Sequence, residues 1–253
     1  MLTELKVIPA NQIFLHEEFE LGRLKKICKK IKSEQQLKNP PIALQLEEDK
    51  YLILDGAHRT LSLKELNCKR IVVQVVKTDQ LSISSWTHHL LDSKKILQEL
   101  DDNPNVYFSD KLEEYSPIAV VYFNDTEKYL YVHKEKNIKL ESKIEVWKEI
   151  VNIYTNKCPC SRLPDNELLP VHGIALSYST LDLGQIKQIV KSNLLLPAGV
   201  TKFNLKSGRI LNLNIPLSFL IREDFIEEDW KELLELWESS IRLYTDPVLL
   251  CEL

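Results

Sequence analysis

The sequence predicts an α+β protein with two domains, a small α/β domain at residues 1–80 and a mixed α/β domain at residues 81–253. Short apolar runs rich in β-branched residues, such as residues 70–76, are typical of buried strands. Amphipathic stretches with helical spacing stand between these runs, as at residues 21–31 and 183–190. A chain of 253 residues is long enough to bury one or two cores of this kind.

Composition favours a globular protein that binds a small ligand. The formal net charge is −4, with 14 Lys and Arg against 11 Asp and Glu in residues 1–80 and 19 against 26 in the rest. This balance disfavours a dedicated nucleic-acid binder, which needs many contacts that neutralise phosphates. No apolar run approaches the ~20 residues that span a bilayer, and the N-terminus lacks a signal-peptide layout, so we expect a cytoplasmic protein outside the membrane. The five cysteines lack disulfide-framework spacing and are expected to be reduced.

The first predicted elements are a short strand and a lysine-rich helix. Residues 5–9 form an apolar run that ends at a proline, which is typical of a strand. Apolar residues recur at helical spacing through residues 21–31, and the lysines between them are expected to be solvated. The acidic residues Glu17, Glu18 and Glu20 precede this helix, where negative charge complements the helix dipole.

A predicted hairpin then leads into the stretch around which the chain is organised. Residues 41–46 and 51–54 predict two strands joined by a polar turn. The sequence Asp-Gly-Ala-His-Arg-Thr follows at residues 55–60 and opens directly into a helical pattern. At such a junction the free N–H groups of Gly56 and Ala57 point toward one spot. The positive end of the helix dipole points toward the same spot. An anion can bind there.

The side chains of this stretch favour phosphate as that anion. Arg59 offers a planar fork, His58 a titratable donor and Thr60 a hydroxyl. Asp55 offers a carboxylate that can hold Mg²⁺. An ordinary Asp-Gly turn, in which Asp55 only caps the helix, is the alternative.

The run Asp55-Gly56-Ala57-His58-Arg59 resembles the phosphate-binding box D/E-G-x-H/R-R of the ParB/sulfiredoxin superfamily. The order of a helix, a Pro-Pro-Ile strand start at residues 40–42 and a return strand into the box is also similar, so the resemblance covers residues 1–80. Within the superfamily, the chain most resembles the free L-serine kinases, a branch with members encoded beside staphylococcal siderophore biosynthesis enzymes.

This resemblance implies a kinase that transfers a phosphoryl group from ATP or ADP to the hydroxyl of free L-serine. The product, O-phospho-L-serine, would feed staphyloferrin B-type siderophore biosynthesis. The resemblance implies that Asp55 is catalytic and holds Mg²⁺, and that the nucleotide phosphates contact Gly56, Ala57, His58, Arg59 and Thr60. It also implies that a glutamate at the entry to the first helix accepts the hydroxyl proton. We predict Glu20 for this role, with Glu17 or Glu18 as the alternatives.

A cluster of Trp86, Thr87, His88 and His89 opens the second domain. A core tryptophan beside surface histidines is one interpretation, and adjacent histidines cannot share a helix face, which weakens a metal site. Similarity to the serine kinases implies a wall of the amino-acid pocket, with Trp86 over the substrate. The later elements predicted from periodicity are strands at residues 118–123, 129–132 and 171–176 and helices at residues 144–154, 183–190 and 227–244.

A basic loop is predicted at residues 197–203, ahead of a strand at residues 210–216. Thr201, Lys202 and Arg209 could close over a nucleotide or the product phosphate. A hairpin with an exposed polar edge is the alternative. The apolar face of the last helix predicts a core contact or a homodimer contact.

Cys158-Pro159-Cys160 does not have zinc-site spacing, since no second ligand pair stands at a suitable distance in the sequence. A surface loop with two reduced thiols is the plain interpretation. Cys-Pro thiolates also occur as ligands in haem-responsive proteins, so regulatory haem binding at Cys158 and Cys160 is a second hypothesis.

Two other classes of protein use a similar box. A ParB-like DNA-binding regulator would place a helix-turn-helix with a basic recognition helix after the first domain, but residues 81–115 are rich in Asp and Glu. A sulfiredoxin-like reductase would have a catalytic cysteine beside the box glycine, where this sequence has Ala57. DNA is therefore only a secondary partner in the prediction, and free L-serine and nucleotide are the primary ones.

Overall fold

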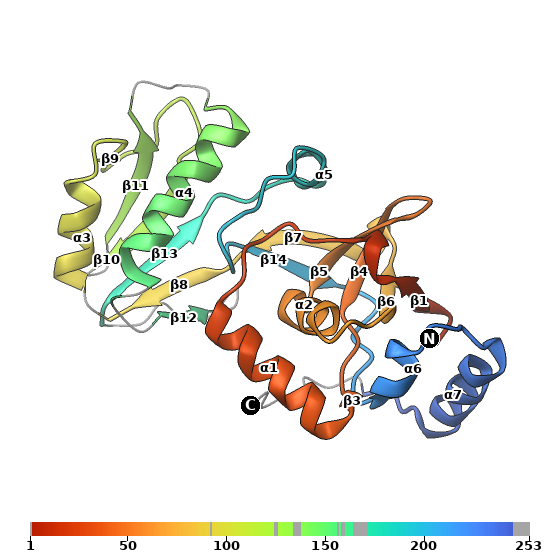
Figure 1. Cartoon of the computed structure of the whole chain (residues 1–253). Helices are drawn as coiled ribbons and strands as arrows, with labels where there is room; N and C mark the ends of the chain where they lie inside the picture. The colour runs from red at the N-terminus through yellow and green to blue at the C-terminus, as the bar shows by residue number, and fades with distance from the viewer. Residues whose placement is uncertain are drawn as a thin grey trace.

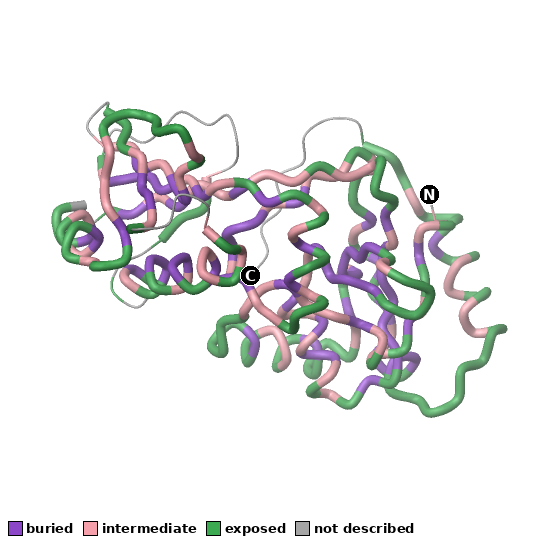
Figure 2. Tube along the Cα trace, turned by 90° about the horizontal axis from the view of Figure 1, so that it is seen from above, coloured by how far each residue is buried: buried purple, intermediate pink, exposed green. Residues whose placement is uncertain are grey.

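The computed structural model describes residues 2–91, 93–123, 126–133, 138–155, 157, 160–163 and 172–244. The α+β class predicted from the sequence is confirmed. Two lobes are joined by the paired strands β7 (Leu81–Ser85) and β14 (Thr201–Leu205), which lie between them in Figure 1. Buried residues run through both lobes (Figure 2).

The first lobe is built on a mixed sheet with the strand order β1-β6-β4-β5-β2. Strand β4 is parallel to β6 and β2 is parallel to β5, while the other neighbours are antiparallel. Two helices that contact each other, α1 and α2, belong to this lobe, and the strands and helices predicted in residues 5–76 are confirmed to within a few residues. The bounds are η1 (Leu2–Glu4), β1 (Leu5–Pro9), η2 (Ala10–Gln12), β2 (Ile13–Phe14), α1 (Leu21–Glu34), β3 (Gln36–Leu37), β4 (Ile42–Glu47), β5 (Lys50–Asp55), α2 (Ala57–Glu65), β6 (Arg70–Val76) and η3 (Thr78–Gln80).

Both faces of this sheet are buried because apolar residues continue through its central strands without alternation. Ala43 and Ile53 lie in one core cluster, with side chains from α1 and α2 near them. Their neighbours Leu44 and Leu52 point to the opposite face and join a second cluster that continues into the other lobe. One face of the sheet is therefore covered by α1 and α2 together with residues from the C-terminal segment, and the other face packs against residues of the second lobe.

The C-terminal segment returns to the first lobe. Strand β15 (Ile215–Pro216) pairs with β3, and the helices α6 (Leu217–Ile221) and α7 (Glu227–Ser240) follow it. Trp237 on α7 is buried and its indole Nε1 donates a 2.8 Å hydrogen bond to the Leu213 carbonyl. The apolar face predicted for the last helix is thus a core contact, and residues 210–237 share a core with the first lobe. The domain boundary at residue 80 stays a prediction.

The prediction of a strand at residues 210–216 is wrong except for its last two residues. Only Ile215–Pro216 is extended and paired, because Asn212 and Asn214 adopt left-handed backbone conformations with φ of 59° and 52°. Asparagine tolerates that region, and a left-handed residue interrupts a strand. The rest of the segment is irregular, and it directly follows Arg209, which pairs with Asp55 of the box.

The second lobe holds an antiparallel sheet with the order β12-β8-β13-β10-β11-β9. Figure 1 shows α3 and α4 beside this sheet. Asp182 caps α5: its carboxylate accepts a 2.8 Å hydrogen bond from the Gln185 amide, and the Gln185 side-chain oxygen accepts one from the Asp182 amide. The bounds are β8 (Thr87–Leu90), α3 (Ser93–Asp101), β9 (Val106–Ser109), β10 (Ala119–Phe123), β11 (Thr126–Val132), α4 (Leu140–Thr155), β12 (Cys160–Leu163), β13 (Ile174–Tyr178) and α5 (Leu183–Lys191).

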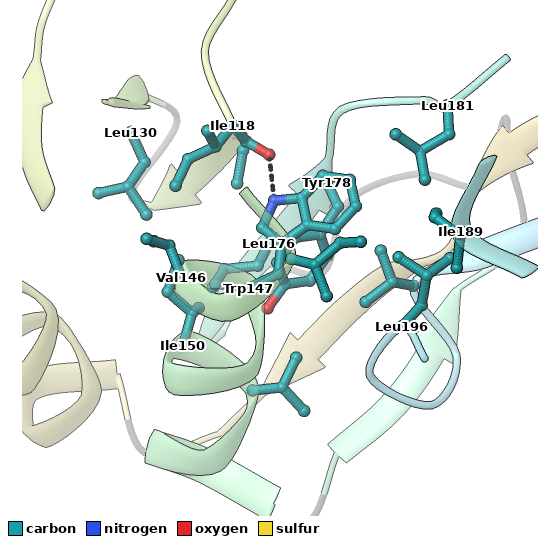
Figure 3. Packing of buried hydrophobic residues seen from close by; sticks show 14 of the residues in the cluster. Ile118, Leu130, Val146, Trp147, Ile150, Leu176, Tyr178, Leu181, Ile189 and Leu196 are labelled. Atoms are coloured by element: carbon teal, nitrogen blue, oxygen red, sulfur yellow. Dashed lines mark hydrogen bonds between the residues drawn. The ribbon is translucent and has the colours of Figure 1, made fainter. Parts of the chain in front are cut away.

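Trp147 on α4 anchors the core of the second lobe. Its side chain is fully buried, and its indole Nε1 donates a 3.0 Å hydrogen bond to the Ile118 carbonyl (Figure 3). Tyr178 packs against the indole edge-on, at 5.7 Å between ring centroids. No helix within the described ranges is long and apolar enough to cross a membrane.

Candidate active site

The box lies where β5 ends and α2 begins, as the sequence predicts. Gly56 is the N-cap and has a left-handed backbone with φ +91°, which an L side chain rarely adopts. A Cβ added there would also lie 3.0 Å from the Arg59 guanidinium. The first intrahelical bond runs from the Thr60 amide to the Gly56 carbonyl, so the amides of the preceding turn are available to an anion.

Arg59 holds the box in place. Its Nη1 donates to the carbonyls of Asn39 and Pro40 at 3.0 and 3.2 Å, and its Nη2 lies 3.3 Å from the Asp55 carboxylate. The same Asp55 oxygen pairs with Arg209, which arrives from the C-terminal segment. Burial favours the neutral carboxyl, but these two guanidinium groups outweigh it and hold the pKa of Asp55 below its usual value.

His58 joins the box to the start of α1. The backbone amide of Glu20, the N-cap residue of α1, donates a 3.0 Å hydrogen bond to His58 Nε2. That nitrogen is therefore unprotonated, and the proton of the neutral ring is on Nδ1. Burial, helped by the positive charge of Arg23, lowers the pKa of His58 and favours this neutral form.

The three candidate glutamates have different surroundings. Glu17 accepts a 3.0 Å hydrogen bond from the Gly199 amide, and Glu18 forms an ion pair with Lys148 at 3.5 Å. The Glu20 carboxylate has no hydrogen bond to any residue that the structure describes, its side chain is 52% exposed, and Arg162 lies 4.0 Å away. Glu20 is also the one of the three whose backbone is bonded to the box. These contacts favour Glu20 as the residue open to a substrate.

A strap, residues 196–199, connects the two lobes beside Glu20. The Leu196 amide donates to the His16 carbonyl and the Glu18 amide donates to the Leu196 carbonyl, both at 2.8 Å. The next contact is made by the Gly199 peptide, whose N–H bonds Glu17 and whose carbonyl accepts a 2.8 Å hydrogen bond from His88 Nε2. The strap thus fixes the segment that carries the candidate glutamates.

The predicted pocket wall, residues 86–89, is divided between the core and the surface. His88 is buried, and both of its ring nitrogens have partners, Gly199 and the Tyr154 hydroxyl at 2.6 Å. His89 Nε2 donates to the His172 carbonyl at 2.8 Å. Trp86 and Thr87 are half-buried, and the Lys202 ammonium lies 4.8 Å from the centre of the Trp86 indole ring.

The prediction of a loop at residues 197–203 is wrong for residues 201–203, which belong to a strand. Thr201 and Lys202 belong to β14, which pairs with β7 in five consecutive register positions. Thr201 is buried, and its hydroxyl lies 3.1 Å from His16 Nε2. Arg209 does reach the box, through its ion pair with Asp55.

Thr60 is fully buried, and its hydroxyl has no hydrogen-bond partner in the described part of the chain. We therefore expect Thr60→Val to leave kcat and the KM for nucleotide unchanged and to alter the free energy of unfolding by less than about 1 kcal/mol, because a shape-matched apolar group replaces an unpaired hydroxyl. Steady-state kinetics and urea denaturation check this. A KM for nucleotide raised tenfold would instead support the contact between Thr60 and phosphate that the sequence predicts.

The side chains predicted to bind Mg²⁺ and haem lie in different parts of the chain. Among the described residues, no three His, Cys, Asp or Glu side chains are grouped to hold a metal ion. Mg²⁺ that arrives with a nucleotide needs only one or two carboxylates, and the ionised Asp55, 42% exposed at its side chain, suits that limited role. Cys158 lies outside the described residues. Cys160 is exposed, and its thiol lies 3.8 Å from the Ser161 carbonyl.

Sequence reasoning missed Arg162 and Gly199. Arg162 stands in a short polar run without a motif, and the sequence around Gly199 predicts only a loop. The Gly199 φ of +76° and the contact of its Cα with the Arg162 guanidinium need three-dimensional information, because the two residues are brought together by β12 and the strap. No local sequence signal could have found this contact.

Comparison with known proteins identifies the family. No family model matches the chain. The ATP-dependent L-serine kinase SbnI of Staphylococcus aureus is 32% identical over 252 residues, which cover 98% of this chain and 97% of SbnI. An ATP-dependent L-serine kinase of Staphylothermus marinus is 32% identical over 98 residues, or 37% of this chain and 39% of the relative.

Solved structures agree with this similarity. A C-terminally truncated SbnI from Staphylococcus aureus has a TM-score of 0.82 at 32% identity and covers 92% of this chain and 96% of its own. A free serine kinase in complex with AMP has a TM-score of 0.68 at 14% identity, over 86% and 93% of the two chains, which shows a shared fold. With the box, its neighbouring glutamate and nearly full-length similarity to SbnI, the chain belongs to the family of ATP-dependent L-serine kinases.

Proposed function

We propose that this protein transfers the terminal phosphoryl group of ATP to the hydroxyl of free L-serine, giving O-phospho-L-serine and ADP. The observation that carries the proposal is the hydrogen bond between the Glu20 amide and His58, which brings an open carboxylate to a phosphate-binding helix terminus. Family membership supports the same reaction, since SbnI is an ATP-dependent L-serine kinase.

The box would hold the phosphates of the nucleotide. The amides that follow Gly56 and the positive end of α2 favour phosphate oxygens. His58 would donate from Nδ1, since its Nε2 already accepts from Glu20. Arg59 would act mainly by keeping the box rigid, because both of its terminal nitrogens have protein partners. Phosphoryl transfer depends on such positioning and charge stabilisation more than on covalent chemistry.

Glu20 would take the proton from the serine hydroxyl as that oxygen attacks phosphorus. The bond from serine oxygen to phosphorus forms while the bond from phosphorus to the leaving oxygen of ADP breaks. A carboxylate that is held beside the phosphate site and has no hydrogen bond from the described residues is available to accept this proton. Glu17 and Glu18 would instead keep the segment attached to the strap and to α4.

Mg²⁺ would neutralise phosphate charge when bound, with Asp55 as its protein ligand. Arg209 shares the Asp55 oxygen and would have to adjust to a cation there. Asp55 is suited to this role because its carboxylate is ionised and partly exposed.

The wider setting rests on the resemblance drawn from the sequence. We assign the first domain to the ParB/sulfiredoxin type and the product to staphyloferrin B-type siderophore biosynthesis. A DNA-binding regulator is not favoured, because the described part of residues 81–115 forms β7, β8, α3 and β9 and no helix-turn-helix. Homodimer formation and haem binding at Cys158 and Cys160 stay predictions.

Phosphorus NMR tests the proposed function directly. Purified protein, ATP, Mg²⁺ and L-serine are expected to give a phosphomonoester signal that requires serine and enzyme together. A parallel reaction with ADP as donor distinguishes the two nucleotides, and signal with ADP alone would revise the donor. If neither nucleotide yields phosphoserine, the protein is not a serine kinase.

A further inference from the structure

Arg162 is a charged residue at the candidate active site to which neither the sequence nor the family likeness gives a role. It lies on β12, opposite His88 of β8 in the strand register, and therefore comes from the second lobe. Its Nη2 is 4.0 Å from the Glu20 carboxylate. The same Nη2 lies 3.4 Å from the Ala198 carbonyl of the strap, and the positive charge of the guanidinium helps to lower the pKa of both His58 and His88.

The backbone of the strap is shaped to hold this guanidinium. A Cβ added to Gly199 would lie 2.2 Å from Arg162 Cζ, so the guanidinium occupies the space that any side chain at that position would fill. The same arrangement exists in the box, where the Arg59 guanidinium covers Gly56. In both places a glycine with positive φ allows an arginine to lie flat against the backbone.

Arg162 differs from Arg59 in how much of its hydrogen-bonding capacity is used. A guanidinium has five N–H donors, and the hydrogen bond of Arg162 within the described residues is a long one, 3.4 Å from Nη2 to the Ala198 carbonyl. Its side chain is 34% exposed. Arg162 therefore presents a positioned fork to whatever ligand lies next to Glu20.

We infer that Arg162 binds the α-carboxylate of the amino-acid substrate and so restricts the kinase to free amino acids. The inference rests on the proposed function. The hydroxyl oxygen and the carboxylate carbon of serine are joined through Cβ and Cα alone, so a serine with its hydroxyl at Glu20 has its carboxylate within reach of Arg162. A guanidinium recognises a carboxylate by paired, charge-assisted hydrogen bonds. The phosphates already have the anion site at the start of α2, which leaves Arg162 for the other anionic group of the reactants.

Substrates without a carboxylate test this assignment. Ethanolamine keeps the hydroxyl and ammonium of serine but lacks its carboxylate. In Arg162→Gln, kcat/KM for L-serine is expected to fall roughly 10- to 150-fold, while kcat/KM for ethanolamine and the KM for ATP stay at their wild-type values. L-Alanine, which keeps the carboxylate but has no hydroxyl, should weaken as a competitive inhibitor by the same factor as serine. Arg162→Lys should recover part of the loss.

Controls separate this inference from the proposed function and from damage to the fold. Arg222→Gln removes an arginine at the C-terminal end of α6 that pairs with Asp229, and this variant should match wild type in every assay. If wild type makes no phosphoserine, the proposed function itself is wrong. If wild type is active but Arg162→Gln loses activity equally toward serine and ethanolamine, with L-alanine inhibition unchanged, Arg162 acts on the transferred phosphoryl group and the inference is overturned.

Discussion

Glu20→Gln is expected to lower kcat for phosphoryl transfer to serine roughly 10²- to 10⁴-fold, the usual contribution of a general base. The amide side chain keeps the size of glutamate but cannot accept the hydroxyl proton. The backbone hydrogen bond from residue 20 to His58 does not involve the side chain, so the box should keep its shape. The KM for ATP is therefore expected to stay near its wild-type value, as coupled-assay kinetics at varied ATP would measure.

Matched glutamate variants make this result specific. Glu34 lies in the last turn of α1, away from the box, and Glu34→Gln should behave as wild type. Glu18→Gln removes an ion pair with Lys148, and Glu17→Gln removes the hydrogen bond with Gly199. If one of these two variants loses kcat as deeply as predicted while Glu20→Gln stays active, the base is that residue and not Glu20.

Acidification from pH 7 to pH 4 is expected to reduce the free energy of unfolding by about 3 kcal/mol through His88 alone. Burial lowers the pKa of His88 from 6.5 to about 4, although its bond to Gly199 opposes the shift. The unfolded chain then binds a proton from about pH 6.5 downward while the folded chain does not. The stabilising effect is complete above pH 6.5, is lost as the pH falls, and changes little more below about pH 4.

The hydrogen-bond network gives this shift a structural reason. The Gly199 carbonyl can only accept, so His88 Nε2 carries the proton and Nδ1 accepts from Tyr154, whose hydroxyl lies 2.7 Å from that of Tyr178. A second proton on the ring would oppose the Tyr154 hydroxyl and would face the positive charge of Arg162. His88 therefore fits its site as the neutral ring.

Urea denaturation of wild type and His88→Gln at pH 7, 5.5 and 4 measures the effect. The variant should be less stable than wild type at pH 7, and the difference should shrink toward pH 4. His16 is also buried with a lowered pKa, so it belongs to the background that both proteins share. A difference between the two proteins that does not vary with pH would contradict the assignment to His88.

Local patterns predicted the elements of the first lobe well. The β-branched run of β6 and the Asp-Gly junction before α2 depend on neighbours in the sequence, and both appear where expected. A metal site at the two adjacent histidines is disfavoured in the sequence on the assumption of a helix, but in β8 they alternate, with His88 in the core and His89 half-buried against Ser161. The two histidines have different surroundings because successive side chains of a strand point to opposite faces, not because of their residue type.

Contacts made by distant segments could not be predicted. The hydrogen bond between Glu20 and His58 spans 38 positions, and only resemblance to a family suggested that the two would meet. The hydrogen bond between Gly199 of the strap and Glu17 joins residues 182 positions apart. The ion pair between Arg209 and Asp55 joins residues 154 positions apart. The sequence of β14 contains polar residues and resembles a loop. It forms a strand because it pairs with β7, which its own sequence does not reveal.

The dependence of the first lobe on both ends of the chain limits how evolution or an engineer could transplant the box. A gene segment that encodes only residues 1–80 would leave Leu44, Leu52 and their neighbours on that sheet face uncovered, and it would lack the helix that carries Trp237. Exposed apolar surface of this kind promotes aggregation. A functional exchange between relatives therefore has to move residues 1–80 and residues 210–240 together and has to cover Leu44 and Leu52, so the box cannot be transferred as one short continuous segment.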